Sequence, residues 1–367
     1  MTLKSITFSR TKLDFTAALN KRVNEYFKTK GISRHGNAEM VLKTIFMFLM
    51  YFGPYGLIIA GVITSPLLLV VSVLIMSIGL SGIGLSVMHD ANHGAYSNKA
   101  WINNTLGYSL NLVGANAFNW KMQHNVMHHT YTNVHEEDED IVSRGVLRLS
   151  PHDEWKSIYK FQHIYAWFLY GLLTISWMVV RDFARLARYQ KNGMVKKHKA
   201  DIAKEWFILI ASKLFYVGYI AVVPLVFTSL PWWQILIGIV SMHYIAGFML
   251  AIIFQPAHVI DGTEYPLPDD NNALENNWNV HQLLTTTNFG NKSRWFSWYV
   301  GGLNFQIEHH LFPNVCHVHY RHISEIVKAT AHEYGLPYKS ARTFLSALQG
   351  HAKQLKQLGA RPSFGLS

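Results

Sequence analysis

Long apolar runs divide this chain, and they predict helices that cross a membrane. Such runs cover residues 41–63, 66–88, 206–227 and 232–254. Each has close to the ~20 residues that a helix needs to cross the hydrocarbon core of a bilayer. The apolar stretch 105–118 would give a helix of only about 21 Å, which is too short to span. The pattern therefore predicts an all-helical integral membrane protein.

Three histidine clusters lie just beyond apolar stretches. Residues 89–93 read HDANH, residues 124–129 read HNVMHH and residues 306–310 read QIEHH. Surface histidines scattered by chance would not give three clusters with helical spacing in such places. We interpret them as the ligands of one polynuclear metal centre held at a membrane surface.

The spacing inside the clusters predicts two metal ions. Residues three or four apart share one face of an α-helix. Such pairs are His89 and His93, His124 and His128, and Gln306 and His309. Adjacent histidines diverge by about 100° around a helix. His129 and His310 can therefore serve a different metal from the histidine that precedes each of them.

The residue types favour iron. The clusters contain no cysteine, and their carboxylates are not arranged as the Glu-x-x-His ligand sets of soluble di-iron bundles. Imidazole-rich sites suit Fe, Zn, Cu or Ni. A structural zinc site needs only four ligands, fewer than are offered here. Iron with open positions for O₂ fits best beside a pool of lipid, while copper and zinc stay open on composition alone.

A fourth polar position belongs with the clusters. His258 follows the last apolar run and would lie at the same depth as the three clusters. His243 precedes it by about 22 Å along a regular helix, so we expect it to be a packing residue. We expect His281 to be a structural residue, although a role as a metal ligand stays open. The acidic run 136–140 could hold a metal, but we interpret it as a solvated loop.

All clusters can face one side of the membrane only if an even number of spans separates them. The aromatic-rich stretch 164–180 runs directly into Arg181, Asp182 and Arg185 and is predicted to be an interfacial helix. Four spans in two hairpins remain, with a histidine-rich cap. Residues 1–40 would form a cytoplasmic segment, and residues 41–367 the membrane domain.

Charge orients this arrangement. The formal net charge is +11, and basic residues are dense in the N-terminal region and in 181–204. The loops between paired spans carry no charge. The positive-inside rule therefore places both termini and all clusters on the cytoplasmic side. The single cysteine, Cys316, fits a reducing compartment. The basic charge suits anionic headgroups, and no nucleic-acid partner is expected.

Several motifs together resemble one family. LNKRVNEYF, LSVMHDANHGAYSN, HNVMHHTYTN and GGLNFQIEHHLFPNVCHVHY occur in this order. They resemble the membrane fatty acid desaturases of the front-end type, in particular cyanobacterial Δ6 acyl-lipid desaturases and bacterial linoleoyl-CoA desaturases. The resemblance covers nearly the whole chain.

The resemblance implies a di-iron centre that uses O₂ as co-substrate and is held mainly by histidines. The ligands it implies are His89, His93, His124, His128, His129, His258, His309 and His310. Gln306 stands where many relatives have a further histidine, and we count it among the catalytic residues with its contact to iron left open. The resemblance also implies that Asp90 and Glu308 orient ligand imidazoles.

The implied reaction inserts a cis double bond into a fatty acyl chain using O₂ and two electrons, at the Δ6 position of linoleoyl-type substrates. Residues 1–40 lack the HPGG haem signature of a fused cytochrome b5 domain. The electron donor would then be an external ferredoxin or cytochrome b5-like protein. The acyl carrier stays open among CoA, carrier protein and glycerolipid.

Two alternatives remain. A fatty acyl hydroxylase could use the same di-iron scaffold, and spacing does not separate it from a desaturase. A metal transporter or sensor is disfavoured, because transport ligands belong near the bilayer midplane, whereas these clusters lie at the ends of the predicted spans.

Overall fold

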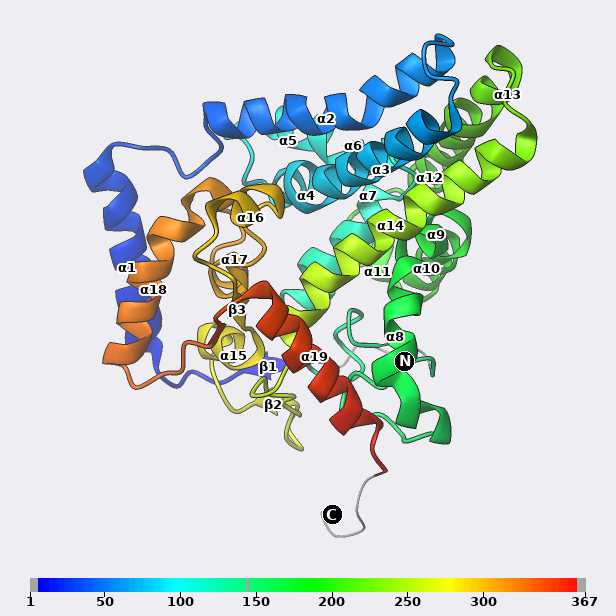
Figure 1. Ribbon diagram of the computed structural model, residues 1–367. Helices are drawn as coiled ribbons and strands as arrows, with labels where there is room; N and C mark the ends of the chain where they lie inside the picture. The colour runs from blue at the N-terminus through cyan, green and yellow to red at the C-terminus, as the bar shows by residue number, and fades with distance from the viewer. Residues whose placement is uncertain (1–5, 143–144, 362–367) are drawn as a thin grey trace. The chain divides into compact units, whose positions relative to one another are not determined.

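A computed structural model describes residues 6–142 and 145–361, and most of these residues are helical (Figure 1). The longer helices are α1 (Leu13–Lys30), α2 (Ala38–Ile59), α3 (Pro66–Gly82), α5 (Ala100–Gly107), α8 (Gln162–Gly171), α10 (Asp182–Lys191), α12 (Ile202–Val217), α14 (Trp232–His258), α15 (Trp278–Thr285), α18 (Tyr320–Glu333) and α19 (Phe344–Gly359). The shorter ones are α4 (Met88–Asn92), α6 (Ser109–Leu112), α7 (Ala117–Trp120), α9 (Leu173–Ser176), α11 (Met194–Lys197), α13 (Val223–Phe227), α16 (Arg294–Tyr299) and α17 (Gln306–Leu311). Four π-helical turns are η1 (Ile83–Val87), η2 (Lys121–His128), η4 (Trp177–Arg181) and η5 (Gly218–Val222), and 3₁₀ turns are η3 (Ser157–Phe161) and η6 (His317–His319).

Among the described residues, four helical stretches are long and apolar enough to cross a membrane. They are Ala38–Ile59, Pro66–Asn92, Ile202–Phe227 and Trp232–His258. The second and third stretches each contain one π-helical turn and continue through it. The prediction of an all-helical membrane protein is confirmed, and each predicted span overlaps one of these candidate helices.

The segment that was predicted to be interfacial is bent. Helical stretches Ser157–Gly171 and Leu173–Lys191 meet at an angle of 59° and would count as a fifth, broken span if taken together. A Cβ atom on Gly247 of α14 would lie 2.8 Å from the carbonyl oxygen of Gly171. The bend and α14 therefore approach backbone to backbone, as small residues allow between membrane helices. The interfacial placement stays a prediction.

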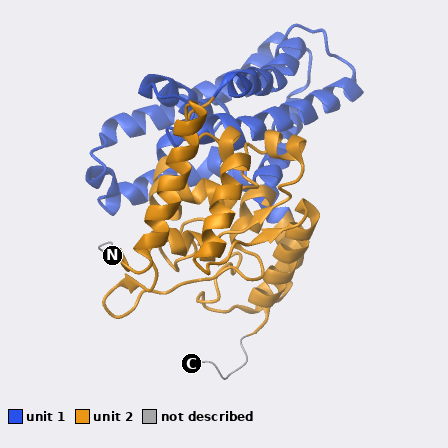
Figure 2. Ribbon diagram, turned by 90° about the vertical axis from the view of Figure 1, so that its left-hand side faces the viewer, with its two compact units in different colours: residues 1–3, 37–120, 168–251 blue, residues 4–36, 121–167, 252–367 orange. Residues whose placement is uncertain are grey.

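The chain forms two compact units, coloured separately in Figure 2. The first contains residues 37–120 and 168–251, and the second contains the described parts of 4–36, 121–167 and 252–367. The second unit holds two short parallel strand pairs. β1 (Thr7–Phe8) pairs with β2 (Ala273–Leu274), and β3 (Asn288–Phe289) pairs with β4 (Ser340–Ala341).

The first unit contains a buried ion pair among its apolar helices. The Nζ atom of Lys213, on α12, donates to Asp182 Oδ2 at 2.7 Å and to the carbonyl oxygens of Gly114 and Trp177 at 2.7 and 2.9 Å. Three oxygens thus satisfy the three ammonium hydrogens. Asn119 donates to the Asp182 carbonyl. This network ties α7 and α10 to α12.

The second unit has a separate apolar core. One face of α1 is buried through Phe15, Leu19, Val23 and Phe27, which recur every three or four residues. They pack in one cluster with residues of α15, α17 and α18, and α1 and α18 lie side by side in Figure 1. This core supports α15 and α17, which carry polar residues of the site described below.

Candidate metal centre

Three segments of the second unit carry six buried histidines. The π-helical turn η2 and the residue after it supply His124, His128 and His129, α14 ends on His258, and α17 supplies His309 and His310. All six are at most 5% exposed. Imidazoles collected away from water need partners for their ring nitrogens, and a metal ion is one such partner.

The π-helical backbone brings a further histidine, His129, to His124. The amide of His129 donates to the carbonyl of His124 at 2.9 Å, five residues back. The His129 side chain consequently meets that of His124, with their Nε2 atoms 3.2 Å apart. The ring of His128 also stacks on that of His124, with centroids 5.2 Å apart, so the pair that the α-helical spacing predicts is present as well. Such π turns are rare and occur often at functional sites.

His124, His129 and His309 form the first group. The Nε2 atom of His129 lies 3.2 Å from that of His124 and 2.9 Å from that of His309. A neutral imidazole carries one N–H, which can point to only one of these neighbours. A cation shared by the three nitrogens accounts for the convergence better than hydrogen bonds do.

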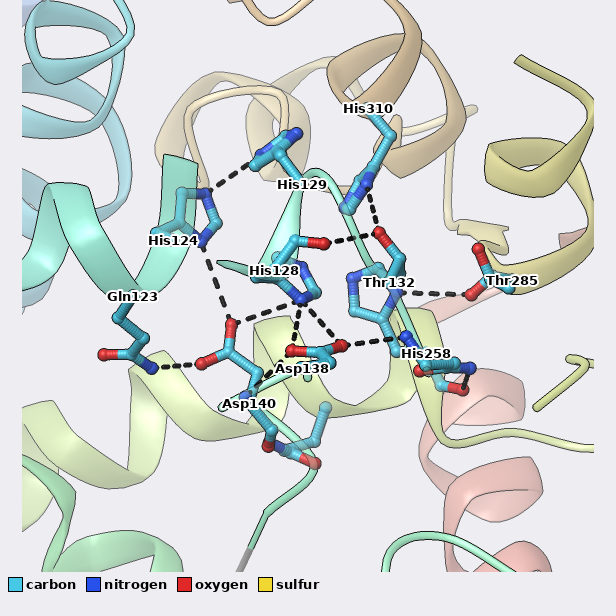
Figure 3. Close-up of polar contacts among 12 residues, drawn as sticks. Gln123, His124, His128, His129, Thr132, Asp138, Asp140, His258, Thr285 and His310 are labelled. Carbon is cyan, nitrogen blue, oxygen red and sulfur yellow. Dashed lines mark hydrogen bonds and ion pairs between the residues drawn. The ribbon is translucent and has the colours of Figure 1, made fainter. Parts of the chain in front are cut away.

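His128, His258 and His310 form the second group. One ring nitrogen of each lies within 4.8 Å of the others. Each Nδ1 atom faces an oxygen acceptor: the Asp138 carboxylate at 3.0 Å, the Thr285 carbonyl at 3.3 Å and the Gln282 amide oxygen at 2.8 Å, respectively. Figure 3 shows the first two of these contacts. Acceptors on the Nδ1 side leave the Nε2 lone pairs available, the usual arrangement around a metal-bound histidine.

Two of these Nε2 atoms have no partner. The Nε2 atoms of His258 and His310 are buried and make no hydrogen bond within the part of the chain that the structure describes. An unpaired buried nitrogen costs free energy, so native proteins rarely keep one. Together with the first group, these atoms fit a centre for more than one metal ion.

The acidic run is part of this site, so its interpretation as a solvated loop is wrong. Asp138 is fully buried and accepts from His128 and from the backbone amides of Asn133 and Asp140. Burial lowers the pKa of His128, but the charges of Asp138 and Asp140 outweigh it and raise that pKa to about 9. Bound metal would have to displace this proton.

Comparisons with known proteins agree with this chemistry. The family described as fatty acid desaturase matches residues 64–342. The chain belongs to the fatty acid desaturase family. The sn-1 linoleoyl-lipid 6-desaturase of Synechocystis sp. is 34% identical over 98% of this chain and 99% of its own length. That of Arthrospira platensis is 32% identical over 98% and 96%. An acyl-lipid (8-3)-desaturase of Physcomitrium patens is 38% identical over 94% and 72%. The resemblance in the motifs is confirmed, and the chain is an oxidoreductase.

The first histidine cluster of this desaturase lies in the first unit. His89 lies in α4, which directly follows the π-helical turn η1, and His93 is the residue after α4. Their ring centroids are 4.8 Å apart, and Trp120 packs edge-on against both. The two imidazoles therefore share a face, as their spacing predicts. Asp90 Oδ1 lies 3.7 Å from His89 Nδ1.

In the third cluster, the two polar residues beside the histidines differ in their partners. Gln306 is buried on α17, and its Nε2 atom makes no hydrogen bond to a described residue. Glu308 accepts hydrogen bonds from the Asn288 amide at 2.8 Å and from the Tyr338 hydroxyl at 3.0 Å, and from no imidazole among the described residues. Burial raises the pKa of Glu308 to about 7, against these two hydrogen bonds. The role implied for Glu308 is therefore wrong, and it links α17 to the segments around β3 and β4.

Two further histidines that the sequence singled out, His281 and His243, have protein partners. His281 Nε2 donates to the Thr132 carbonyl at 2.9 Å. His243 lies between Tyr216 and Thr174 inside the first unit. Sequence reasoning missed Asp138, Thr285 and Gln282. Thr285 acts through its backbone and leaves no sequence signal, whereas a carboxylate ten residues after His128 could have been considered.

Proposed function

We propose that this protein is a di-iron desaturase that introduces a cis double bond at the Δ6 position of linoleoyl lipids. The observation that carries the proposal is the convergence of six buried imidazoles in the second unit. Protein oxygens accept from the Nδ1 atoms of His128 and His310 and so hold these two rings in place. The names of the cyanobacterial relatives supply the position and the lipid-bound substrate.

The proposed iron ligands are those that the motifs imply. They are His89, His93, His124, His128, His129, His258, His309 and His310, with Gln306 beside them. The placement of His89 and His93 at this centre rests on their sequence spacing and on the family. Iron, O₂ and two electrons together supply the oxidising power to remove hydrogen from an unactivated methylene group.

The chain's own residues prepare this chemistry. Asp138 and the Thr285 carbonyl hold the Nδ1 sides of His128 and His258, which keeps both Nε2 lone pairs directed at a metal. The imidazoles are shielded from water, which protects reactive species from side reactions. The position of the double bond is then set by how far the acyl chain enters the protein, a matter of proximity and orientation.

The topology and the electron donor follow from charge. We propose four spans in two hairpins, an interfacial helix near 164–180, and a cytoplasmic histidine-rich cap that includes residues 1–40. Residues 1–5 of that segment lie outside the described residues. The basic segment 181–204 supports the cytoplasmic placement. An acidic external donor, ferredoxin or a cytochrome b5-like protein, would be attracted to this basic protein.

A fatty-acid profile tests the proposal. The chain, a His128→Ala variant and a His332→Ala control are expressed in a host fed linoleate that contains a competent donor. His332 is exposed on α18, so its replacement leaves the site intact. We expect γ-linolenate with the parent chain and the control, and none with His128→Ala. A hydroxylated product would instead establish the hydroxylase, and a double bond elsewhere would overturn the Δ6 position.

A further inference from the structure

Gln282 lies between the two histidine groups of the second unit. It belongs to α15 and is fully buried. Its Nε2 atom donates to the carbonyl oxygen of His129 at 3.2 Å. Its Oε1 atom lies 2.8 Å from His310 Nδ1 and accepts from the Thr132 hydroxyl at 2.9 Å. One side chain therefore touches the backbone of one proposed ligand and the ring of another.

These contacts fix the amide in one orientation. A carbonyl oxygen can only accept, so the NH₂ end of Gln282 must face His129. The oxygen end then faces His310, and an amide oxygen also can only accept. His310 Nδ1 must therefore carry the ring proton, which leaves the lone pair on Nε2. That Nε2 atom is the buried one without a partner among the described residues.

We propose that Gln282 is a positioning residue that holds His310 in the tautomer that binds metal. The proposal rests on the metal centre proposed above. The neighbouring ligand His128 has a charged partner, Asp138, whereas His310 has a neutral one. A carboxylate raises the basicity of a ligand imidazole more than an amide does. The two imidazoles consequently differ in how strongly their Nε2 atoms donate electrons to a metal. Gln282 makes His310 the weaker ligand of the two.

Metal titration tests this role without an activity assay. The full-length protein is purified in detergent, stripped with a chelator and titrated with Co²⁺ under anaerobic conditions, and the ligand-field absorption is followed. We expect Gln282→Met, which keeps the volume but removes the acceptor, to weaken Co²⁺ binding about 10–100-fold and to shift the absorption band. Gln282→Glu keeps an oxygen toward His310. Burial favours the protonated carboxyl, whose O–H can still donate to the His129 carbonyl, so affinity should return close to the parent level.

A second buried glutamine supplies the matched control. Gln162 is equally buried in the same unit but binds the backbone of Arg148 and Leu355 instead of a histidine. Gln162→Met should lower thermal stability and leave the Co²⁺ affinity of the folded protein unchanged. Equal weakening in this control would trace the effect to general instability and overturn the proposal.

The remaining outcomes also decide. Parent-like affinity and absorption in Gln282→Met would refute the role of Gln282. If Gln282→Met does not fold, the Gln282→Glu variant decides. A Co²⁺ affinity of Gln282→Glu at least tenfold below that of the parent would contradict the proposal that His310 needs an acceptor oxygen at this position. His310→Ala separates the two proposals. Parent-like Co²⁺ binding in His310→Ala would remove His310 from the metal centre itself.

Discussion

Asp138→Ala removes the carboxylate that holds the Nδ1 side of His128. Asp138 is fully buried, and its oxygens accept from His128 at 3.0 Å and from the amides of Asn133 and Asp140 at 2.9 Å. A hydrogen bond to a charged group contributes about 1.5–3 kcal/mol, but such contributions do not add within one network. We expect a loss of about 3–5 kcal/mol, as when one partner of a buried pair is removed.

The same change should weaken metal binding. Loss of a partner that orients a ligand imidazole typically costs 10–100-fold in affinity, which corresponds to about 1.4–2.7 kcal/mol. Asp138→Asn keeps one acceptor oxygen for His128 but turns an NH₂ group toward backbone amides. Asp138→Asn should therefore lose less free energy of unfolding and less metal affinity than Asp138→Ala.

Iron content and thermal unfolding measure both effects. Iron per folded protomer is determined on detergent-purified protein, and unfolding is followed at one fixed scan rate because membrane proteins of this kind can unfold irreversibly. Glu136→Gln is the control, since Glu136 belongs to the same acidic run but is exposed. Parent-like iron content and unfolding temperature in Asp138→Ala would refute the reasoning.

Two further predictions concern the first unit. Lys213→Met leaves the Asp182 carboxylate buried without its cation and should lower the free energy of unfolding of that unit by about 3–5 kcal/mol in thermal unfolding. Adding Asp182→Leu should recover part of this loss. A double variant no more stable than Lys213→Met would contradict this prediction. Gly247→Ala places a methyl group 2.8 Å from the Gly171 carbonyl oxygen and should cost about 1–3 kcal/mol. Gly238→Ala, on the same helix with its nearest neighbour at 3.6 Å, should be neutral or slightly stabilising, and equal losses in the two variants would show that the close approach does not matter.

The amino-acid sequence by itself determined the class of the protein. Apolar runs of bilayer length have one stable solution in lipid, which is a helix that satisfies its own backbone. The four predicted spans accordingly overlap the four candidate membrane helices. The clusters at 124–129 and 306–310, with His258, were recognisable because residue type and local spacing need no knowledge of distant contacts.

Only the tertiary structure decided which groups meet. The π-helical turn that pairs His124 with His129 depends on a backbone hydrogen bond five residues back, which residue spacing does not reveal. Asp138 was hidden in an acidic run because burial of a charge depends on the partners that surround it. Gln282 lies more than a hundred residues from Thr132 and His129. Its role follows from donors and acceptors brought together by folding, and local sequence carries no record of that.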